Sequence, residues 1–283
     1  MATNGRWALG RHHIYVLIFL AVLVPLFLPA PRTVRVTPEV KVVYDRIESL
    51  APGQTVMLAC EYDPSMSAEL SPMHIAVLHQ CFRKDIRVLE TCLSANGVSL
   101  VEGELKSIAE RYGKTYGEDY VFLGYKPYPG IVIMAMGENF RNPFPSDFYN
   151  TPLDSLPMMR GIRNYQSVAL VLTINATSGI DYWITYGAGR YRFPLAAAAS
   201  AVMAPNYYNY LQSGQIFGLI GGLRGSAEYE ELVGMPGSAV RGMFVQSISH
   251  LLIVALIVVG NVSYFWSRYR RRKPGGGGEV ERA

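Results

Sequence analysis

Cysteine is scarce in this 283-residue chain: only Cys60, Cys81 and Cys92 are present, and no two of them form a C-x-x-C pair. This spacing argues against a zinc site, a redox dithiol and a disulfide framework, so we expect no metal ion. Cys60 and Cys92 fall in two predicted strands that are candidates for neighbours. A single disulfide between them and three buried free thiols both remain open.

Charge is also scarce, at 17% of residues, and it is unevenly placed. Residues 31–242 hold 18 Lys and Arg against 20 Asp and Glu, whereas the two ends together hold 8 basic and 2 acidic residues. A nucleic-acid-binding domain needs a basic surface on its folded part. The middle of this chain is slightly acidic, which excludes nucleic acid as an expected partner.

Recognisable catalytic motifs are missing too. The sequence has no G-x-S-x-G elbow before a helix, no H-E-x-x-H and no glycine-rich phosphate loop of defined spacing. His74 and His79 are five residues apart, which does not match the i, i+4 spacing that chelates zinc on a helix. We therefore expect no catalytic residue and no cofactor.

Long apolar runs, in contrast, are present at both ends. Residues 14–30 carry no charge and follow Arg11, His12 and His13. A helix of 17 residues reaches roughly 26 Å, which just spans the hydrocarbon core of a bilayer. The alternative is a cleaved signal peptide, but Leu28 then occupies a position where the peptidase prefers a small residue. We expect a first transmembrane helix over 13–30 that acts as an uncleaved signal anchor.

The second apolar run covers 243–266 and contains no Asp, Glu, Lys or Arg. Five basic residues follow it, namely Arg268, Arg270, Arg271, Arg272 and Lys273. Because basic residues stay on the cytoplasmic side, this bias predicts that the tail (267–283) and the N-terminus (1–12) are both cytoplasmic. The chain is then a two-pass protein of the cell membrane, with its middle part outside the cytoplasm.

The middle part combines helical and strand patterns. After a stalk and linking helix (31–53), residues 54–178 alternate apolar strand-like runs with amphipathic helices. The strand-like runs are 55–62, 86–92, 120–124, 131–136 and 167–175. Strands that are apolar on both faces and alternate with helices indicate a mostly parallel sheet covered on both sides. We predict a doubly wound α/β sandwich, flanked by the two transmembrane helices.

Residues 179–242 form a Gly- and Tyr-rich, membrane-proximal part of the same domain. Within it, 195–205 reads equally well as a small-residue strand or as a buried helix. Five glycines with spacing near one helical turn suggest a flat helix face that packs against the sheet or against a second copy near the membrane surface; they are Gly214, Gly218, Gly221, Gly222 and Gly225. The many aromatic rings of this part, Tyr182 and Trp183 among them, suit an interface and a core equally well.

Four polar residues follow or end predicted strands and are candidates for a ligand site: Asp63, Glu90, Glu138 and Asn175. In open α/β sheets, ligands bind beyond the carboxyl ends of strands. The lack of catalytic motifs favours a structural or interaction subunit whose partners are the bilayer, a second copy or other membrane proteins. The alternative is a ligand-binding sensor or transport accessory that uses these four residues, and a membrane-anchored hydrolase or transferase comes third.

Overall fold

The computed structural model describes residues 10–28, 35–235 and 237–272. The chain divides into two units, Pro31–Gly242 and the pair of end segments Met1–Ala30 and Met243–Ala283. The first unit is built on a six-stranded parallel sheet in the order β3-β2-β1-β4-β5-β6. Its strands are β1 (Thr55–Glu61), β2 (Arg87–Thr91), β3 (Tyr120–Phe122), β4 (Leu170–Asn175), β5 (Leu195–Ala199) and β6 (Leu219–Gly221). The predicted α/β class with a parallel sheet is confirmed.

The strands are apolar because both faces of the sheet are covered. Every residue of β1 is buried. Leu58 and Cys60 point into one hydrophobic core, and Met57 and Ala59 point into the other. Alternate side chains of a strand point to opposite faces, so a strand between two helical layers must be apolar along its whole length.

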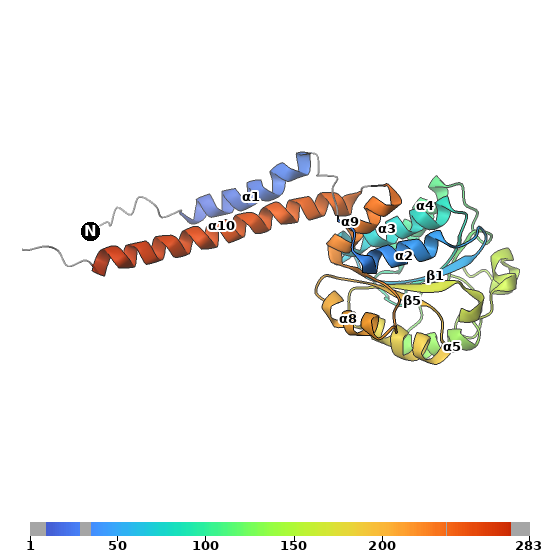
Figure 1. Ribbon diagram of the computed structural model, residues 1–283. Helices are drawn as coiled ribbons and strands as arrows, with labels where there is room; N and C mark the ends of the chain where they lie inside the picture. Colours follow the sequence, from blue (N-terminus) through green and yellow to red (C-terminus); the bar gives the residue numbers. More distant parts are fainter. Residues whose placement is uncertain (1–9, 29–34, 236, 273–283) are drawn as a thin grey trace, which may run out of the picture. The chain divides into compact units, whose positions relative to one another are not determined.

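Helices pack on both faces of this sheet (Figure 1). One face carries α2 (Pro38–Glu48), α3 (Ser67–Arg83), α4 (Val98–Arg111) and α9 (Gly222–Val233). The other carries α5 (Pro129–Glu138), η1 (Leu153–Ser155), η2 (Pro157–Gly161), η3 (Tyr165–Ser167), α6 (Gly179–Tyr182), the π-helix η4 (Trp183–Ala188), α7 (Gly189–Tyr191) and α8 (Ala204–Gln212). The helix predicted beside the stalk is α2, and it buries Val40, Val43 and Ile47 in the core.

The strand order reverses between β1 and β4. From β1 the chain winds outward through β2 to β3, and then returns to place β4 on the other side of β1. Loops that leave β1 and β4 therefore diverge to opposite faces and open a crevice between the two carboxyl ends. In the register of this pair, Glu61 lies opposite Asn175.

Two local predictions are corrected or resolved. Residues 131–136 were expected to form a strand but belong to helix α5. Pro129 stands at its first turn, where proline is well tolerated, and a buried helix can be as uniformly apolar as a buried strand. The segment 195–205 was open between strand and helix; it forms strand β5 and, after a turn, the start of α8.

The five glycines do not lie on one helix, so the expected helix face is wrong, whereas packing against the sheet is seen at Gly225. Gly214 lies in a turn after α8, Gly218 precedes β6, and Gly221 ends β6. Gly222 and Gly225 belong to α9. Their close contacts are with residues of the same domain. An added Cβ at Gly218 would overlap Val43, and one at Gly225 would press on Ile220. The glycines let α2 and α9 approach β6.

The end segments contribute two apolar helices, α1 (Arg11–Phe27) and α10 (Ser238–Arg272). In the described part of the chain, one helix is long and apolar enough to cross a membrane, the Ser238–Trp266 stretch of α10. Helix α1 is apolar but shorter, with 17 residues. Of the predicted basic flank, Arg268 is exposed in α10, Arg270, Arg271 and Arg272 end that helix, and Lys273 lies outside the described residues, as do 29–30.

Candidate functional site

A pocket of about 420 Å³ opens where the carboxyl ends of β1 and β4 meet. It is lined by Glu61, Tyr62, Asp63, Ser65, Met66, Leu93, Ser94, Pro129, Asn175, Ala176, Thr177, Ser178, Gly179 and Tyr182. Asp63 and Asn175, two of the four predicted ligand residues, come together here. The volume suits a small molecule, and the location is the switch point of the sheet, where open α/β folds bind ligands.

Glu61 is the buried carboxylate of this pocket. Its Oε2 accepts a hydrogen bond from Asn175 Nδ2 at 2.7 Å, and its Oε1 accepts one from Trp183 Nε1 at 2.7 Å. Burial raises the pKa of Glu61, and the two hydrogen bonds lower it. Burial is the larger effect, so the pKa is raised to about 7. A carboxyl group held in this way has a fixed orientation and free lone pairs beside the pocket.

The helix that supplies Trp183 is unusual in its geometry. Between α6 and α7 it widens into the π-helix η4, which begins at Trp183. Wide π-helical turns occur frequently at functional sites because they redirect side chains that a regular helix would point elsewhere. Trp183 is fully buried and places its indole N–H on Glu61.

Close backbone approach at Gly179 completes this arrangement. A Cβ at this position would overlap the Asn175 amide and lie 2.8 Å from Glu61 Oε2. Glycine therefore lets the first turn of α6 approach the two polar side chains. Asn175 in turn accepts hydrogen bonds from the backbone N–H and the hydroxyl of Thr177, which orient its amide.

The pocket has a negative electrostatic character. The hydroxyl and backbone N–H of Ser65 donate to Asp63, and these hydrogen bonds lower the pKa of that carboxyl below its ordinary value. None of the residues that line the pocket in the described chain is Lys, Arg or His. Such a lining disfavours phosphate and carboxylate ligands and favours cationic or neutral polar ones.

The other two predicted ligand residues lie elsewhere. Glu138 is exposed at the end of α5, because the segment before it is a helix rather than a strand. Glu90 lies within β2, fully buried on the face that carries α3. Neither lines the pocket at the switch point.

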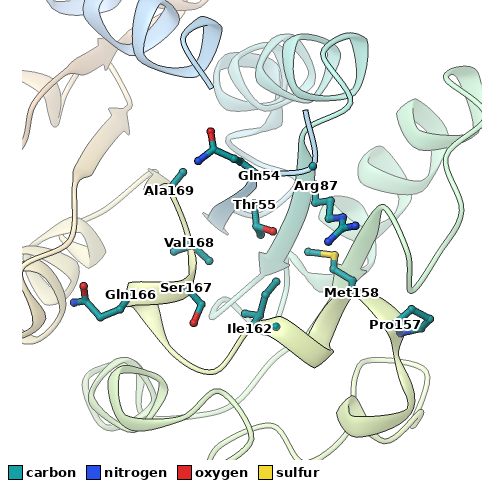
Figure 2. Close-up of a pocket in the computed structure, with 12 residues that line it drawn as sticks. Gln54, Thr55, Arg87, Pro157, Met158, Ile162, Gln166, Ser167, Val168 and Ala169 are labelled. Atoms are coloured by element: carbon teal, nitrogen blue, oxygen red, sulfur yellow. The ribbon is translucent and has the colours of Figure 1, made fainter. Parts of the chain in front are cut away.

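A second pocket, of about 360 Å³, lies at the opposite end of the sheet (Figure 2). Thr55 and Arg87 border it at the amino ends of β1 and β2, and Met158 and Ile162 border it from the segment after β3. Amino ends of parallel strands are rarely used for ligands, since the diverging loops of the switch point are at the other end. We therefore place the candidate site at the carboxyl end.

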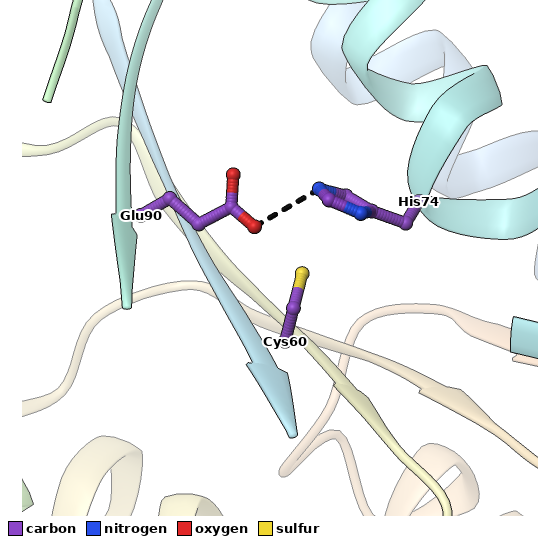
Figure 3. Close-up of side chains that lie close together, drawn as sticks. All are labelled: Cys60, His74 and Glu90. Atoms are coloured by element: carbon purple, nitrogen blue, oxygen red, sulfur yellow. Dashed lines mark ion pairs between the residues drawn. The ribbon is translucent and has the colours of Figure 1, made fainter. Parts of the chain in front are cut away.

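A cluster of three buried side chains lies on the α3 face of the sheet (Figure 3). Cys60 comes from β1, Glu90 from the adjacent β2 and His74 from α3, and their donor atoms lie within 4.8 Å of one another. His74 Nε2 is 2.9 Å from Glu90 Oε1. Burial raises the pKa of the Cys60 thiol well above its ordinary value.

The far side of the His74 ring faces a polar network. Its Nδ1 lies 2.9 Å from Glu104 Oε2 of α4, and the Tyr62 and Ser71 hydroxyls also donate to Glu104. Burial raises the pKa of Glu104, but these hydrogen bonds, that of His74 first, bring it below its ordinary value. Burial lowers the pKa of His74, but its interactions with Cys60 and Glu90 raise it well above its ordinary value.

This cluster was not predicted from the sequence. Its members are 14 and 16 residues apart, and only the pairing of β1 with β2 and the packing of α3 bring them together. One signal for it is present in the sequence: Glu90 is a charged residue inside an apolar run of strand length. Burying such a charge costs free energy unless it has a partner. All three cysteines are free and buried, which settles the open question of a Cys60–Cys92 disulfide.

No known family model matches this chain, and no curated protein shows significant similarity to it.

Proposed function

We propose that this protein is a two-pass membrane protein whose extracytoplasmic α/β domain binds a small cationic or neutral polar ligand at the switch point of its sheet. The observation that carries the proposal is Glu61, a buried carboxylate held by Asn175 and Trp183 on the wall of a pocket of about 420 Å³. The role is that of a sensor or transport accessory. A structural subunit, which the missing catalytic motifs favoured, becomes the second candidate.

Placement of the polar groups supports ligand binding. A buried carboxylate costs free energy unless it is hydrogen-bonded, and both oxygens of Glu61 have a donor. Each carboxylate oxygen keeps a further lone pair, and Glu61 lines the pocket together with serine and threonine residues. Asp63 adds a second carboxylate at the rim, so a ligand with an amine or several hydroxyl groups fits the lining.

The membrane part of the proposal draws on α1, on α10 and on the basic flank of α10. Residues of α1 and α10 together line an apolar groove, including Leu20 and Val24 of α1 and Leu251 and Leu252 of α10. Two apolar helices with basic residues beyond the second support a hairpin in the bilayer with both termini in the cytoplasm. The domain between them is then extracytoplasmic.

Ligand binding is tested by thermal-shift measurements on the full chain in detergent, with amino acids, polyamines, sugars and nucleosides as probes. A hit from the amine or polyol class is expected to stabilise the wild type and to lose at least about tenfold in affinity in Glu61→Gln or Asp63→Asn, since one charge-assisted hydrogen bond contributes about 1.5–3 kcal/mol. Glu138→Gln is the matched control, because Glu138 is an exposed carboxylate outside the pocket. Binding that responds equally to all three substitutions would refute the site.

Topology is tested by thiol labelling in intact cells. The three native cysteines are buried, so their background reaction with a membrane-impermeant maleimide is low. A cysteine introduced as Glu138→Cys is expected to react from outside, whereas one introduced as Gly276→Cys is expected to react only after permeabilisation. The reverse pattern would overturn the two-pass arrangement.

An exposed aromatic surface favours the second candidate, an interaction subunit. The rings of Tyr182 and Tyr186 stack with their centroids 6.0 Å apart and pack over Gly130 at the start of α5. Beside them, Tyr128 is 73% exposed and Ile131 63% exposed. Large exposed rings are typical of protein interfaces. A photo-crosslinker at Tyr128 is expected to capture a partner protein if this surface is an interface, and to give no adduct if it only borders the ligand pocket.

A further inference from the structure

Glu90 and His74 make a contact that leaves polar atoms without hydrogen bonds. Both are fully buried, and His74 Nε2 lies 2.9 Å from Glu90 Oε1. This contact is an ion pair when His74 is protonated, but neither Glu90 oxygen nor His74 Nε2 has a hydrogen-bond partner among the described residues. A buried carboxylate is very costly without a positive charge beside it, and at this position either a protonated His74 or a metal ion supplies that charge.

Glu104 determines which ring nitrogen faces the cluster. Because His74 Nδ1 lies 2.9 Å from Glu104, its N–H donates to that carboxylate. When a metal ion displaces the Nε2 proton of His74, Nε2 presents its lone pair toward Cys60 and Glu90. A lone pair facing a carboxylate is repulsive unless a proton or a metal ion lies between them. A carboxylate that orients a histidine from behind is the arrangement found around metal-binding histidines.

We infer that Cys60, His74 and Glu90 form a binding site for a divalent transition-metal ion, of which zinc is the best match. The donors are one sulfur, one nitrogen and one oxygen, a set that suits zinc and disfavours magnesium and calcium, which prefer oxygen alone. A divalent ion with a thiolate, a carboxylate and a neutral imidazole is uncharged overall. The ion and its three ligands are then neutral together, and the Glu104 carboxylate lies on the far side of the His74 ring.

The spacing of the donors fits this ion with a small adjustment. Zinc–sulfur bonds are about 2.3 Å long and zinc–nitrogen and zinc–oxygen bonds about 2.0 Å, so ligands on a tetrahedral ion lie roughly 3.3–3.6 Å apart. The donor atoms of the cluster all lie within 4.8 Å of one another, and the His74–Glu90 separation of 2.9 Å widens by a few tenths of an ångström on coordination. The ion ties β1, β2 and α3 together at the centre of one core.

The test is the metal content of the full-length protein, purified in detergent from cells grown with zinc. About one zinc ion per chain is expected in the wild type, and at least a tenfold lower content in Cys60→Ala and Glu90→Gln. Cys81→Ala is the matched control, since Cys81 is an equally buried thiol on α3 outside the cluster, and it is expected to retain the ion. Wild-type protein without metal, or a content that Cys60→Ala does not lower, would overturn the site.

Cobalt binding provides a measurement on the wild type, which does not depend on whether the Cys60 and Glu90 variants fold. Co²⁺ added to metal-free wild-type protein is expected to give a thiolate-to-cobalt charge-transfer band in the near ultraviolet. Cys81→Ser is expected to show the same band. A spectrum without that band means that no cysteine binds the ion, and the contact between His74 and Glu90 is then bridged by a proton.

Glu104 is a positioning residue in this scheme, because it holds His74 from behind. Glu104→Gln is expected to retain the cobalt band but to weaken zinc affinity by about 10–100-fold, as substitutions behind metal-binding histidines do. A competition titration with a chromophoric chelator measures this change. An unchanged affinity would contradict the orientation of the histidine that the inference requires.

Discussion

The indole nitrogen of Trp183 donates a hydrogen bond to Glu61 Oε1 over 2.7 Å and so joins a π-helical turn to the end of the central strand β1. The two residues are 122 positions apart in the chain. Both are buried, so neither can replace the other's hydrogen bond with solvent water. Through this contact, the wall of the pocket is part of the core of the domain. A substitution that breaks it is therefore expected to lower both the free energy of unfolding and the affinity for ligand.

Trp183→Phe removes the donor while keeping an aromatic ring. It is expected to lower the free energy of unfolding by about 2–4 kcal/mol, since a cavity is formed and Glu61 Oε1 loses its hydrogen bond. Tyr165→Phe is a suitable comparison, because it removes a neutral hydrogen bond from the buried Tyr165 hydroxyl to the Ile133 carbonyl and is expected to cost only about 0.5–1.5 kcal/mol. Denaturant unfolding of both variants gives the ranking, and equal losses would show that Glu61 does not need the indole.

Gly179→Ala tests the close approach beside the pocket. The added methyl group would overlap the Asn175 side chain and press on Glu61 Oε2, so a loss of about 1–3 kcal/mol is expected, together with loss of ligand binding. Gly103→Ala makes the same chemical change in the exposed middle of α4, where an added Cβ meets nothing within 4 Å. It is expected to stabilise the protein by about 0.5–1 kcal/mol. Thermal unfolding of the two variants should therefore shift in opposite directions.

Much of the sheet could be predicted from the sequence because burial on both faces leaves a strong apolar signal. The runs at 55–62, 86–92 and 167–175 contain β1, β2 and β4. The run at 131–136 is predicted as a strand but forms part of helix α5, because it is apolar on every side. The sequence pattern of such a buried helix does not differ from that of a buried strand. Strand β6 has three residues and lies among glycines, so its pairing with β5 is set by packing rather than by local preference.

The candidate site was predictable only where strand ends alone define it. Asp63 and Asn175 follow from the rule that ligands gather at carboxyl ends of parallel strands, and both line the pocket. Trp183 did not follow from any rule, because its direction depends on the π-helical turn. The sequence predicts Glu90 at the end of its strand facing the ligand site, but in β2 its side chain points into the core toward His74. A side chain's face depends on the strand register, and one position reverses it.

The buried imidazole of His79 predicts a pH dependence of stability. Burial, and then the charge of Arg111, lower the pKa of His79 below its ordinary value of 6.5. The unfolded chain therefore binds the proton at a higher pH than the folded one. The stability that neutral His79 contributes is present above pH 6.5 and is lost as the pH falls through that value toward the lower folded pKa.

His79→Gln removes this titration while keeping a polar side chain beside the Tyr112 hydroxyl, which lies 3.1 Å from His79 Nδ1. The midpoint of thermal unfolding is expected to fall more steeply between about pH 7.5 and about pH 5.5 in the wild type than in this variant. All other titrating groups are shared by the two proteins, so the difference between the two curves isolates His79. Parallel curves would mean that the pKa of His79 is not lowered by folding.

Glu230 caps the first turn of α10, and this contact can be tested directly. Its carboxylate is buried and accepts hydrogen bonds from the backbone N–H groups of Gly237, Ala239 and Val240 at 2.8–3.1 Å. The first N–H groups of a helix have no partner within the helix, and a negative charge there also favours the helix dipole. Glu230→Ala is therefore expected to destabilise this turn by about 1–2 kcal/mol.

Hydrogen exchange measured by mass spectrometry gives the readout for this cap. Peptides that cover 237–240 are expected to exchange roughly five- to thirtyfold faster in Glu230→Ala than in the wild type, which corresponds to the same 1–2 kcal/mol. Glu231→Ala, on the neighbouring residue of α9, controls for the loss of one carboxylate, since the Glu230 oxygens accept all three of these hydrogen bonds. If exchange at 237–240 rises equally in both variants, the first turn of α10 is stabilised by net charge rather than by the cap.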